Sequence, residues 1–250
     1  MLLGASNLTL AFPRVIARLR DIVPAPLAVL AAIGHGRSYG RPSRVFFREL
    51  PGIIECGLWR ALESGPELET RAVLADFGND LVYGAAVDEV ADWIALILRR
   101  LAAHGARTTL VRLPMANLER LRPLRFSIAR GLLYPMHKID LHTIRARARA
   151  LDARIAELAL AHAASLVDQR EGWFGLDPIH IRRAKRDEAW SALLAPLAQH
   201  EAPSGSPTLE AADRWKISLM RPERRRWMGR EKTRLQPCAT LLDGTVLSLY

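Results

Sequence analysis

Short apolar runs alternate with longer amphipathic stretches along most of the chain. Short runs rich in Val, Leu and Ile are typical of strands that lie buried in a parallel sheet. They predict five strands, at Met1–Ala5, Leu27–Ile33, Arg71–Asp76, Thr108–Leu113 and Ser165–Asp168. The stretches between them, in which apolar residues recur at helical spacing, predict helices at Leu8–Asp21, Gly52–Glu63, Val87–His104, Leu118–Leu133 and His142–Ala164.

Strands that alternate with helices indicate βαβ units, and therefore a parallel sheet with helices packed on both faces. We expect a three-layer α/β/α sandwich with a five-stranded, mainly parallel sheet. The chain has 250 residues, of which 50% are hydrophobic, so it is long enough to bury one large core. This composition excludes a disordered, collagen-like or coiled-coil chain.

The last quarter of the chain has a different pattern. It predicts a helix at Asp187–His200 that breaks near Pro196, a Pro-, Gly- and Ser-rich loop over residues 201–208, and a helix at Leu209–Met220. The pair Asp243-Gly244 between two β-rich runs predicts a hairpin. We expect one domain over residues 1–200, and over residues 201–250 an extension packed on that domain.

The formal net charge is +10, from 36 Lys and Arg against 26 Asp and Glu. Half of it lies in residues 221–234, a segment with seven cations and two anions. Such a segment can contact phosphates, with Trp227 stacking on a base. However, Pro222, Glu223 and Glu231 interrupt the cations, and no nucleic-acid-binding motif accompanies them. We therefore expect a solvated arginine-rich surface and no nucleic-acid partner.

Cysteine usage and hydropathy bear on the location of the protein. Cys56 and Cys238 lie far apart and form no CxxC motif, which favours a reducing compartment. Charged residues interrupt every hydrophobic run, so we expect no membrane span. The N-terminal region has no basic segment before its first apolar run, as a signal peptide would have. We expect a cytoplasmic protein, unless a targeting segment precedes this chain.

Two polar segments follow predicted strands, where open α/β folds place their functional sites. The first is Gly4-Ala5-Ser6-Asn7, directly before a helix. Ser6 is a candidate nucleophile, because negative charge that develops near a helix N-terminus is stabilised. The second is residues 76–80, where the Asn79 side chain offers an uncharged N–H donor for an oxyanion. Taken singly, Ser6 is also a good helix cap, and Gly-Asn-Asp is an ordinary turn.

A third segment, Asp177-Pro178-Ile179-His180, follows the last predicted strand. If Asp177 caps a helix with Pro178 at its first position, His180 falls in the first turn, within reach of the Asp177 carboxylate. A carboxylate on one ring nitrogen fixes the tautomer and leaves the other nitrogen as a general base. Taken alone, Asp-Pro is also a common way to begin a helix.

Together and in this order, the three segments resemble the sequence blocks of the SGNH hydrolases, the GDSL family of esterases and lipases. The resemblance covers residues 1–185, and residues 77–81 and 177–180 are its most specific parts. It implies Ser6 as nucleophile, His180 as general base and Asp177 as the residue that orients His180. It also implies an oxyanion hole formed by the Ser6 N–H, a glycine N–H and the Asn79 side chain.

This chain departs from the family pattern in two blocks. Ala5 stands before the serine, where the family has Asp. The second block offers Gly34, Gly36 and Gly40 where the family shows one glycine donor; we favour Gly40, and Gly36 after it. For the substrate pocket we predict Trp173, Phe174 and Tyr83 as lining residues, although aromatic side chains of this kind also pack in protein cores.

The resemblance predicts a serine-dependent hydrolase that acts on a small carboxylic ester or thioester through an acyl-enzyme. No metal or other cofactor is expected, because the histidines form no HExxH motif or cluster and the chain has no nucleotide-binding motif. Three alternatives remain open: an acyltransferase on the same fold, an inactive binding module, and a basic nucleic-acid-associated protein. The sequence specifies no oligomeric state.

Overall fold

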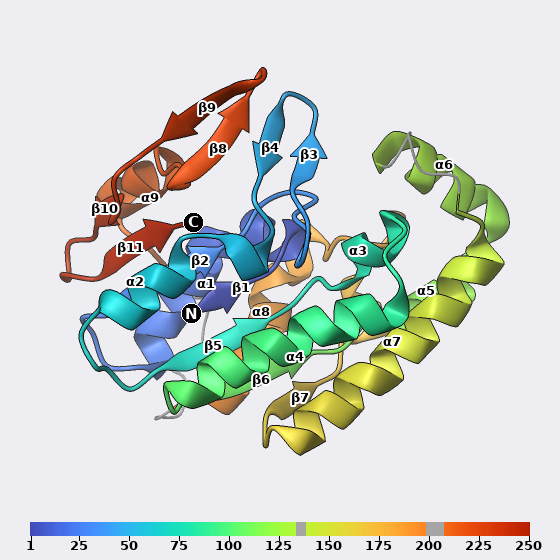
Figure 1. The fold of residues 1–250 in the computed structure, drawn as a ribbon, viewed down its shortest axis with the longest axis horizontal. Helices are drawn as coiled ribbons and strands as arrows, with labels where there is room; N and C mark the ends of the chain where they lie inside the picture. Colours follow the sequence, from blue (N-terminus) through green and yellow to red (C-terminus); the bar gives the residue numbers. More distant parts are fainter. Residues whose placement is uncertain (134–138, 199–207) are drawn as a thin grey trace.

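The main sheet of the protein contains all five predicted strands (Figure 1). The computed structural model describes residues 1–133, 139–198 and 208–250, and within them this sheet has seven strands in the order β10-β11-β2-β1-β5-β6-β7. The predicted strands are β1 (Leu2–Leu3), β2 (Ala28–Ala32), β5 (Arg71–Leu74), β6 (Arg107–Val111) and β7 (Ser165–Val167), all paired in parallel. The predicted α/β class is confirmed.

The other two strands of this sheet come from the C-terminal region. β10 (Ala239–Thr240) and β11 (Val246–Leu249) form the predicted antiparallel hairpin, and Gly244 adopts φ +84° in its turn. β11 also pairs in parallel with β2, so the sheet exceeds the five strands that we predicted. The division of the chain at residue 200 stays a prediction, and most of the predicted loop over 201–208 lies outside the described residues.

Helices cover both faces of the sheet (Figure 1). α1 (Ser6–Ile22) and α8 (Arg186–Leu194) pack on one face, and α4 (Val87–Ala103) and α7 (Leu141–Ala161) pack on the other. Successive side chains of a strand point to opposite faces. Accordingly, Leu2 of β1 lies in the core beneath α1, while Leu3 lies in the core beneath α4.

Several predicted helices are divided or shorter in the structure. A 3₁₀ turn η1 (Ile53–Glu55) precedes α2 (Leu58–Ser64), and α5 (Met115–Arg120) is separate from α6 (Pro123–Leu133), because Pro123 suits a first helical turn. α8 gives way to a 3₁₀ turn η4 (Ala195–Leu197) at Pro196, as predicted. The remaining helical elements are α3 (Gly78–Val82), α9 (Ala211–Ser218), η2 (Glu171–Trp173) and η3 (Arg183–Lys185). No helix among the described residues is long and apolar enough to cross a membrane.

A second, antiparallel sheet was not predicted. Its order is β3-β4-β8-β9, with β3 (Ser43–Val45), β4 (Arg48–Leu50), β8 (Arg224–Trp227) and β9 (Arg230–Thr233). It joins the segment after β2 to the basic segment 221–234, and Arg226 forms an ion pair of 2.9 Å with Glu49 across the pairing. These strands are short and mostly charged, so they lack the apolar alternation that reveals a strand in a sequence. The sheet projects beyond the main sheet (Figure 1).

Candidate active site

The Asp76 carboxylate organises the turn that carries Ser6. Ser6 is the first residue of α1 and follows β1, while Asp76 follows the neighbouring strand β5. Asp76 Oδ2 accepts hydrogen bonds from the backbone N–H groups of Ala5 (3.0 Å), Asn7 (3.0 Å) and Leu8 (3.3 Å). The Ser6 N–H has no acceptor among the described residues. It therefore remains available to a ligand at the helix N-terminus.

Asn7 joins the Ser6 turn to the loop that carries His180. Its Nδ2 donates to Asp76 Oδ1 (2.9 Å) and to the carbonyl oxygen of Ile179 (3.0 Å), and its Oδ1 accepts from the N–H of Ile181 (2.9 Å). Neither Asn7 nor Asp76 was predicted as a site residue. The sequence indicates them only by their position, because Asn7 follows Ser6 and Asp76 lies in the segment that carries Asn79.

Asp177 and His180 form the predicted pair, but without the predicted helix. The segment is a loop in which Asp177 Oδ1 accepts from the N–H groups of Ile179 (2.9 Å) and His180 (3.1 Å). The pair of Asp177 Oδ2 and His180 Nδ1 is 2.7 Å apart. Burial raises the pKa of Asp177, but the hydrogen bonds from His180 and Ile179 outweigh it and hold this pKa below its usual range. With Nδ1 engaged, Nε2 is the ring nitrogen left for a substrate or a nucleophile.

Asn79 is buried in the first turn of α3. This turn is bound to the glycine-rich loop, which is formed by residues 34–40. Its Nδ2 donates to the carbonyl oxygen of Arg37 at 3.4 Å. The neighbouring Asp80 accepts from the Ser38 hydroxyl and, at 3.0 Å, from the Tyr39 N–H. Burial raises the pKa of Asp80 to about 6, against the effect of those hydrogen bonds. These contacts place the glycine-rich loop beside Asn79.

Gly36 is the glycine of this loop that shares a cavity with Ser6 and His180. It adopts φ +62°, a left-handed conformation that suits glycine, and a Cβ there would lie 2.7 Å from the Tyr83 hydroxyl. That hydroxyl donates to the Gly36 carbonyl oxygen at 2.7 Å. Burial, assisted by the charge of Asp80, raises the pKa of Tyr83 to about 12. Tyr83 therefore lines the cavity and also holds Gly36 in place, while its role in binding substrate stays a prediction.

The structure places three other predicted residues away from the Ser6 cavities. Gly40, our first choice for the oxyanion hole, packs against the Trp93 ring so closely that a Cβ would overlap ring atoms. Trp173 is 1% exposed and donates its indole N–H to Glu188 at 3.1 Å. Phe174 is 7% exposed and belongs to the core beneath α1. Trp173 and Phe174 therefore pack in the core, and neither lines the cavities at Ser6.

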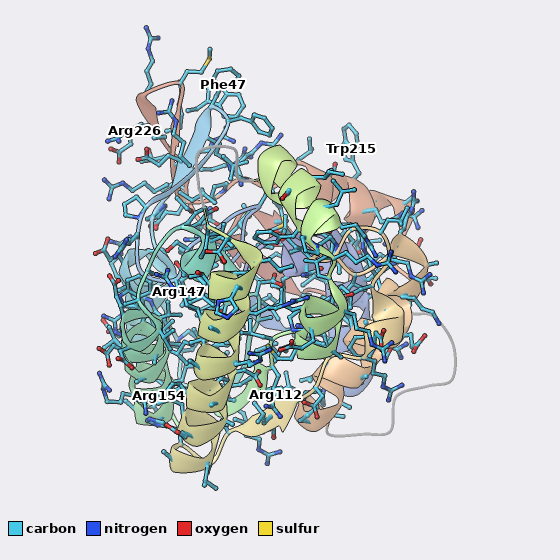
Figure 2. All side chains as sticks on the ribbon, turned by 90° about the vertical axis from the view of Figure 1, so that its right-hand side faces the viewer. Phe47, Arg112, Arg147, Arg154, Trp215 and Arg226 are labelled. Carbon is cyan, nitrogen blue, oxygen red and sulfur yellow. The ribbon has the colours of Figure 1, made fainter. Side chains whose placement is uncertain are left out.

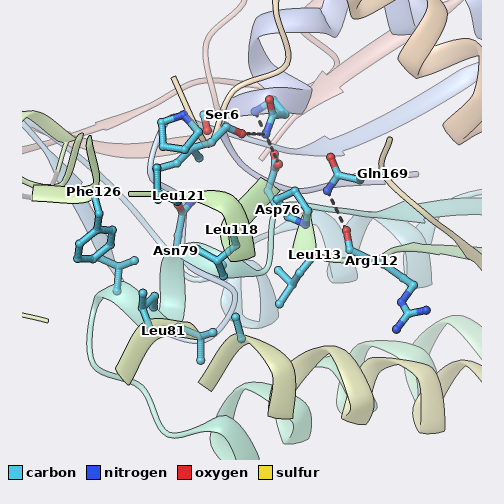
Figure 3. Close-up of a pocket in the computed structure, with 18 residues that line it drawn as sticks. Ser6, Asp76, Asn79, Leu81, Arg112, Leu113, Leu118, Leu121, Phe126 and Gln169 are labelled. Atoms are coloured by element: carbon cyan, nitrogen blue, oxygen red, sulfur yellow. Dashed lines mark hydrogen bonds between the residues drawn. The ribbon is translucent and has the colours of Figure 1, made fainter. Parts of the chain in front are cut away.

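Two cavities meet at Ser6. The first, of about 130 Å³, has Ser6, Asp76 and Asn79 at its polar end (Figure 3). Its other walls are mostly apolar and include Leu81, Val82, Leu113, Leu118, Leu121, Phe126, Ile144 and Ala148. The second, of about 430 Å³, is lined by Ser6, His35, Gly36, Val45, Phe46, Phe47, Arg48, Tyr83, His180 and Trp227. Ser6 thus shares one cavity with the oxyanion donor candidate and the other with the base candidate.

His35 is a second histidine in the cavity with His180. Burial lowers the pKa of His35, and the nearby Arg48 and His180 lower it further, while the Asp76 carboxylate opposes this shift. The backbone carbonyl of His35 accepts from Arg48 at 3.0 Å. Among the described residues, no three His, Cys, Asp or Glu side chains gather as metal ligands would.

Solved structures share this fold. No protein-family model matches the sequence, and no curated protein matches it significantly. One crystal structure superposes with a TM-score of 0.55 at 16% identity, over 78% of this chain and 94% of that chain. The psychrotrophic esterase EstA from Pseudoalteromonas sp. superposes with a TM-score of 0.50 at 10% identity and the same coverage. At these identities the likeness shows the fold alone, and the predicted three-layer α/β/α fold is confirmed.

Proposed function

We propose that the chain hydrolyses carboxylic esters or thioesters through an acyl-enzyme formed on Ser6. The observation that carries this proposal is the position of Ser6 where the two cavities meet, with Asn79 on one side and His180 on the other. The pair of Asp177 and His180 supports it further, because the carboxylate holds the imidazole in the orientation that a general base needs.

In the proposed reaction, the Ser6 hydroxyl attacks the carbonyl carbon of the substrate and His180 Nε2 takes the hydroxyl proton. The tetrahedral intermediate then expels the alcohol or thiol, which receives that proton from His180. A water molecule, deprotonated by His180, attacks the acyl-enzyme, and collapse of the second intermediate releases the acid and restores the Ser6 hydroxyl. No direct hydrogen bond joins Ser6 and His180 in the described structure, and such contacts commonly tighten when substrate binds.

The oxyanion of each intermediate would be bound by three donors. They are the Ser6 N–H at the N-terminus of α1, the Asn79 amide and the Gly36 N–H, with Gly36 taking the place of Gly40. Donors that are already oriented before the reaction are worth several kcal/mol in such sites, because developing charge is met without rearrangement. Tyr83, which binds the Gly36 carbonyl, supports this arrangement.

Covalent labelling tests the proposal. A fluorophosphonate probe is expected to label the wild-type protein at Ser6 and to leave Ser6→Ala unlabelled, because only an activated serine displaces the fluoride. Mass spectrometry of the labelled peptide identifies the site. Ser127→Ala, which removes an exposed serine of α6, serves as the matched control and should label normally. A folded wild-type protein that resists the probe would instead indicate a binding module without activity.

The apolar cavity is proposed to hold the acyl chain, and Ala148 tests this. Ala148 is a buried residue of α7 that lines the cavity, so Ala148→Leu fills part of the space. We expect kcat/KM for an octanoyl ester to fall by about tenfold or more, since a few methylene groups lose their contacts. The value for an acetyl ester should change little, because a short acyl group stays near Ser6.

Ala150→Leu makes the same substitution at an exposed position of α7 and should leave both values unchanged. Equal losses for the octanoyl and acetyl esters in Ala148→Leu would contradict the assignment, because they would indicate a general disturbance rather than a shorter acyl pocket.

A further inference from the structure

Two β-turns present large apolar side chains to solvent at one end of the second sheet. Phe46 (87% exposed) and Phe47 (58%) lie between β3 and β4, Trp227 (43%) is the last residue of β8, and Met228 (65%) follows it in the turn to β9. The turns touch, because the Met228 N–H donates to the Phe47 carbonyl oxygen at 2.9 Å. We call these four residues the aromatic tip. Such a cluster is uncommon on a monomer surface that contacts only water.

The aromatic tip borders the candidate active site. Phe46, Phe47 and Trp227 line the same cavity as Ser6 and His180. The tip stands at the projecting end of the second sheet (Figure 1), where Figure 2 labels Phe47 of the tip and Arg226 of β8. A molecule that approaches Ser6 from this direction therefore passes directly along the tip.

Helix α6 adds a second apolar element beside the other cavity. Leu124 is 73% exposed and Ile128 is 63% exposed, whereas Phe126 of the same helix lines the apolar cavity that ends at Ser6. Figure 1 shows α6 and the second sheet projecting on the same side of the molecule, beyond the main sheet. Both cavities at Ser6 are therefore bordered by exposed apolar side chains.

Positive charge accompanies the aromatic tip. The strands and turns of the second sheet, residues 43–50 and 224–234, carry eight cationic side chains and two carboxylates. The carboxylates are occupied by arginines, Glu49 by Arg226 (2.9 Å) and Glu231 by Arg224 (2.6 Å). The Arg225 guanidinium lies 5.8 Å from the centre of the Trp227 ring. The sheet thus combines a projecting apolar end with a net charge of +6 along its strands.

We propose that the aromatic tip docks on an anionic lipid bilayer, with its side chains among the acyl chains and the arginines at the headgroups. In a bilayer the apolar acyl chains lie beneath the charged headgroups, so a tip with apolar side chains at its end and cations behind them matches this arrangement. Each cation near an anionic surface contributes about 1 kcal/mol to binding. Nucleic acid would instead favour a groove that tracks the phosphates, with aromatic rings along its floor. Docking would bring the cavity of Ser6 and His180 to the lipid surface, but it does not depend on ester hydrolysis.

Vesicle co-sedimentation tests the proposal, and it is performed in a Ser6→Ala background so that lipid turnover plays no part. Vesicles of phosphatidylcholine with phosphatidylglycerol should bind the full chain, and pure phosphatidylcholine vesicles should bind it about tenfold or more weakly. The double substitution Phe46→Ser with Phe47→Ser is expected to weaken binding to the anionic vesicles by about tenfold or more. Added salt should weaken binding as well, because it screens the headgroup charge.

Trp215→Ser is the matched control, because Trp215 is an aromatic residue on α9 that is 66% exposed. This variant should bind like the parent protein, and thermal unfolding checks that each variant is folded. The proposal is overturned if the phenylalanine variant binds as tightly as its parent, or if anionic vesicles bind nothing at low salt. Preferential binding of single-stranded DNA that displaces vesicles would also overturn it, in favour of a nucleic-acid surface. None of these outcomes affects the labelling experiment at Ser6.

Discussion

Replacing His180 by alanine is expected to lower kcat/KM for a small soluble ester by about 10⁴-fold, because no other group would accept the Ser6 proton in the right orientation. Ser6→Ala should cause a loss of similar size. The variant with both substitutions should be no less active than either alone, since residues that act as one unit lose their whole contribution at the first substitution. Steady-state kinetics with a p-nitrophenyl acetate substrate measures all three.

His35→Ala is the matched control, because His35 lines the same cavity as His180. The carboxylate of Asp177 binds His180 at 2.7 Å, whereas burial and neighbouring positive charge are the main influences on His35. We therefore expect a much smaller loss for His35→Ala. A large loss in His35→Ala together with an active His180→Ala would transfer the role of general base to His35.

The sequence predicted the main sheet well because buried parallel strands carry a local signal. Each of the five strands is a short apolar run, so its own residues identify it without information on the strands that pair with it. The rule that sites gather at the carboxyl ends of such strands then placed Ser6, Asn79 and His180 in the same region. The structure brings Ser6 into one cavity with Asn79 and another with His180.

The parts that the sequence did not reveal depend on contacts between distant segments. Glu49 and Arg226 pair across the second sheet although they are 177 positions apart. Both strands are short and mostly charged, so neither strand has a hydrophobic pattern of its own. The segment 221–234 was expected as a solvated arginine-rich surface; its strands are exposed, but they also complete a sheet next to the candidate site.

The choice between Gly36 and Gly40 shows the same limit within the site. Both glycines lie in the segment after β2, and their spacing does not indicate which one faces Ser6. The decision is made by side chains from later elements: Trp93 of α4 packs on Gly40, and Tyr83 binds the carbonyl of Gly36. Likewise, a turn rather than a helix brings Asp177 to His180, because the short Asp side chain bonds to the backbone just ahead of it.

Asp76→Asn is expected to lower the free energy of unfolding by about 3 kcal/mol, because charge-assisted hydrogen bonds are strong and an amide has only one acceptor oxygen. The Asp76 carboxylate accepts from Ala5, Asn7 and Leu8 at one oxygen and from the Asn7 side chain at the other. In the variant, the amide NH₂ would replace one carboxylate oxygen, so a donor would face another donor and that hydrogen bond would be lost. For a chain of this size the melting temperature should fall by about 6–12 °C, and kcat/KM by about 100-fold as Ser6 shifts.

A second substitution at Asp76, which adopts φ +66°, separates the contribution of the carboxylate from that of the backbone conformation. Asp76→Gly suits this conformation at no steric cost, so it would be neutral if the backbone alone mattered. We expect instead a loss of stability close to that of Asp76→Asn, since glycine leaves the same N–H groups without an acceptor. Asp168→Asn changes an exposed aspartate after β7 and should alter stability by less than about 0.5 kcal/mol. A stable, active Asp76→Gly would show that the turn at Ser6 is held by other contacts.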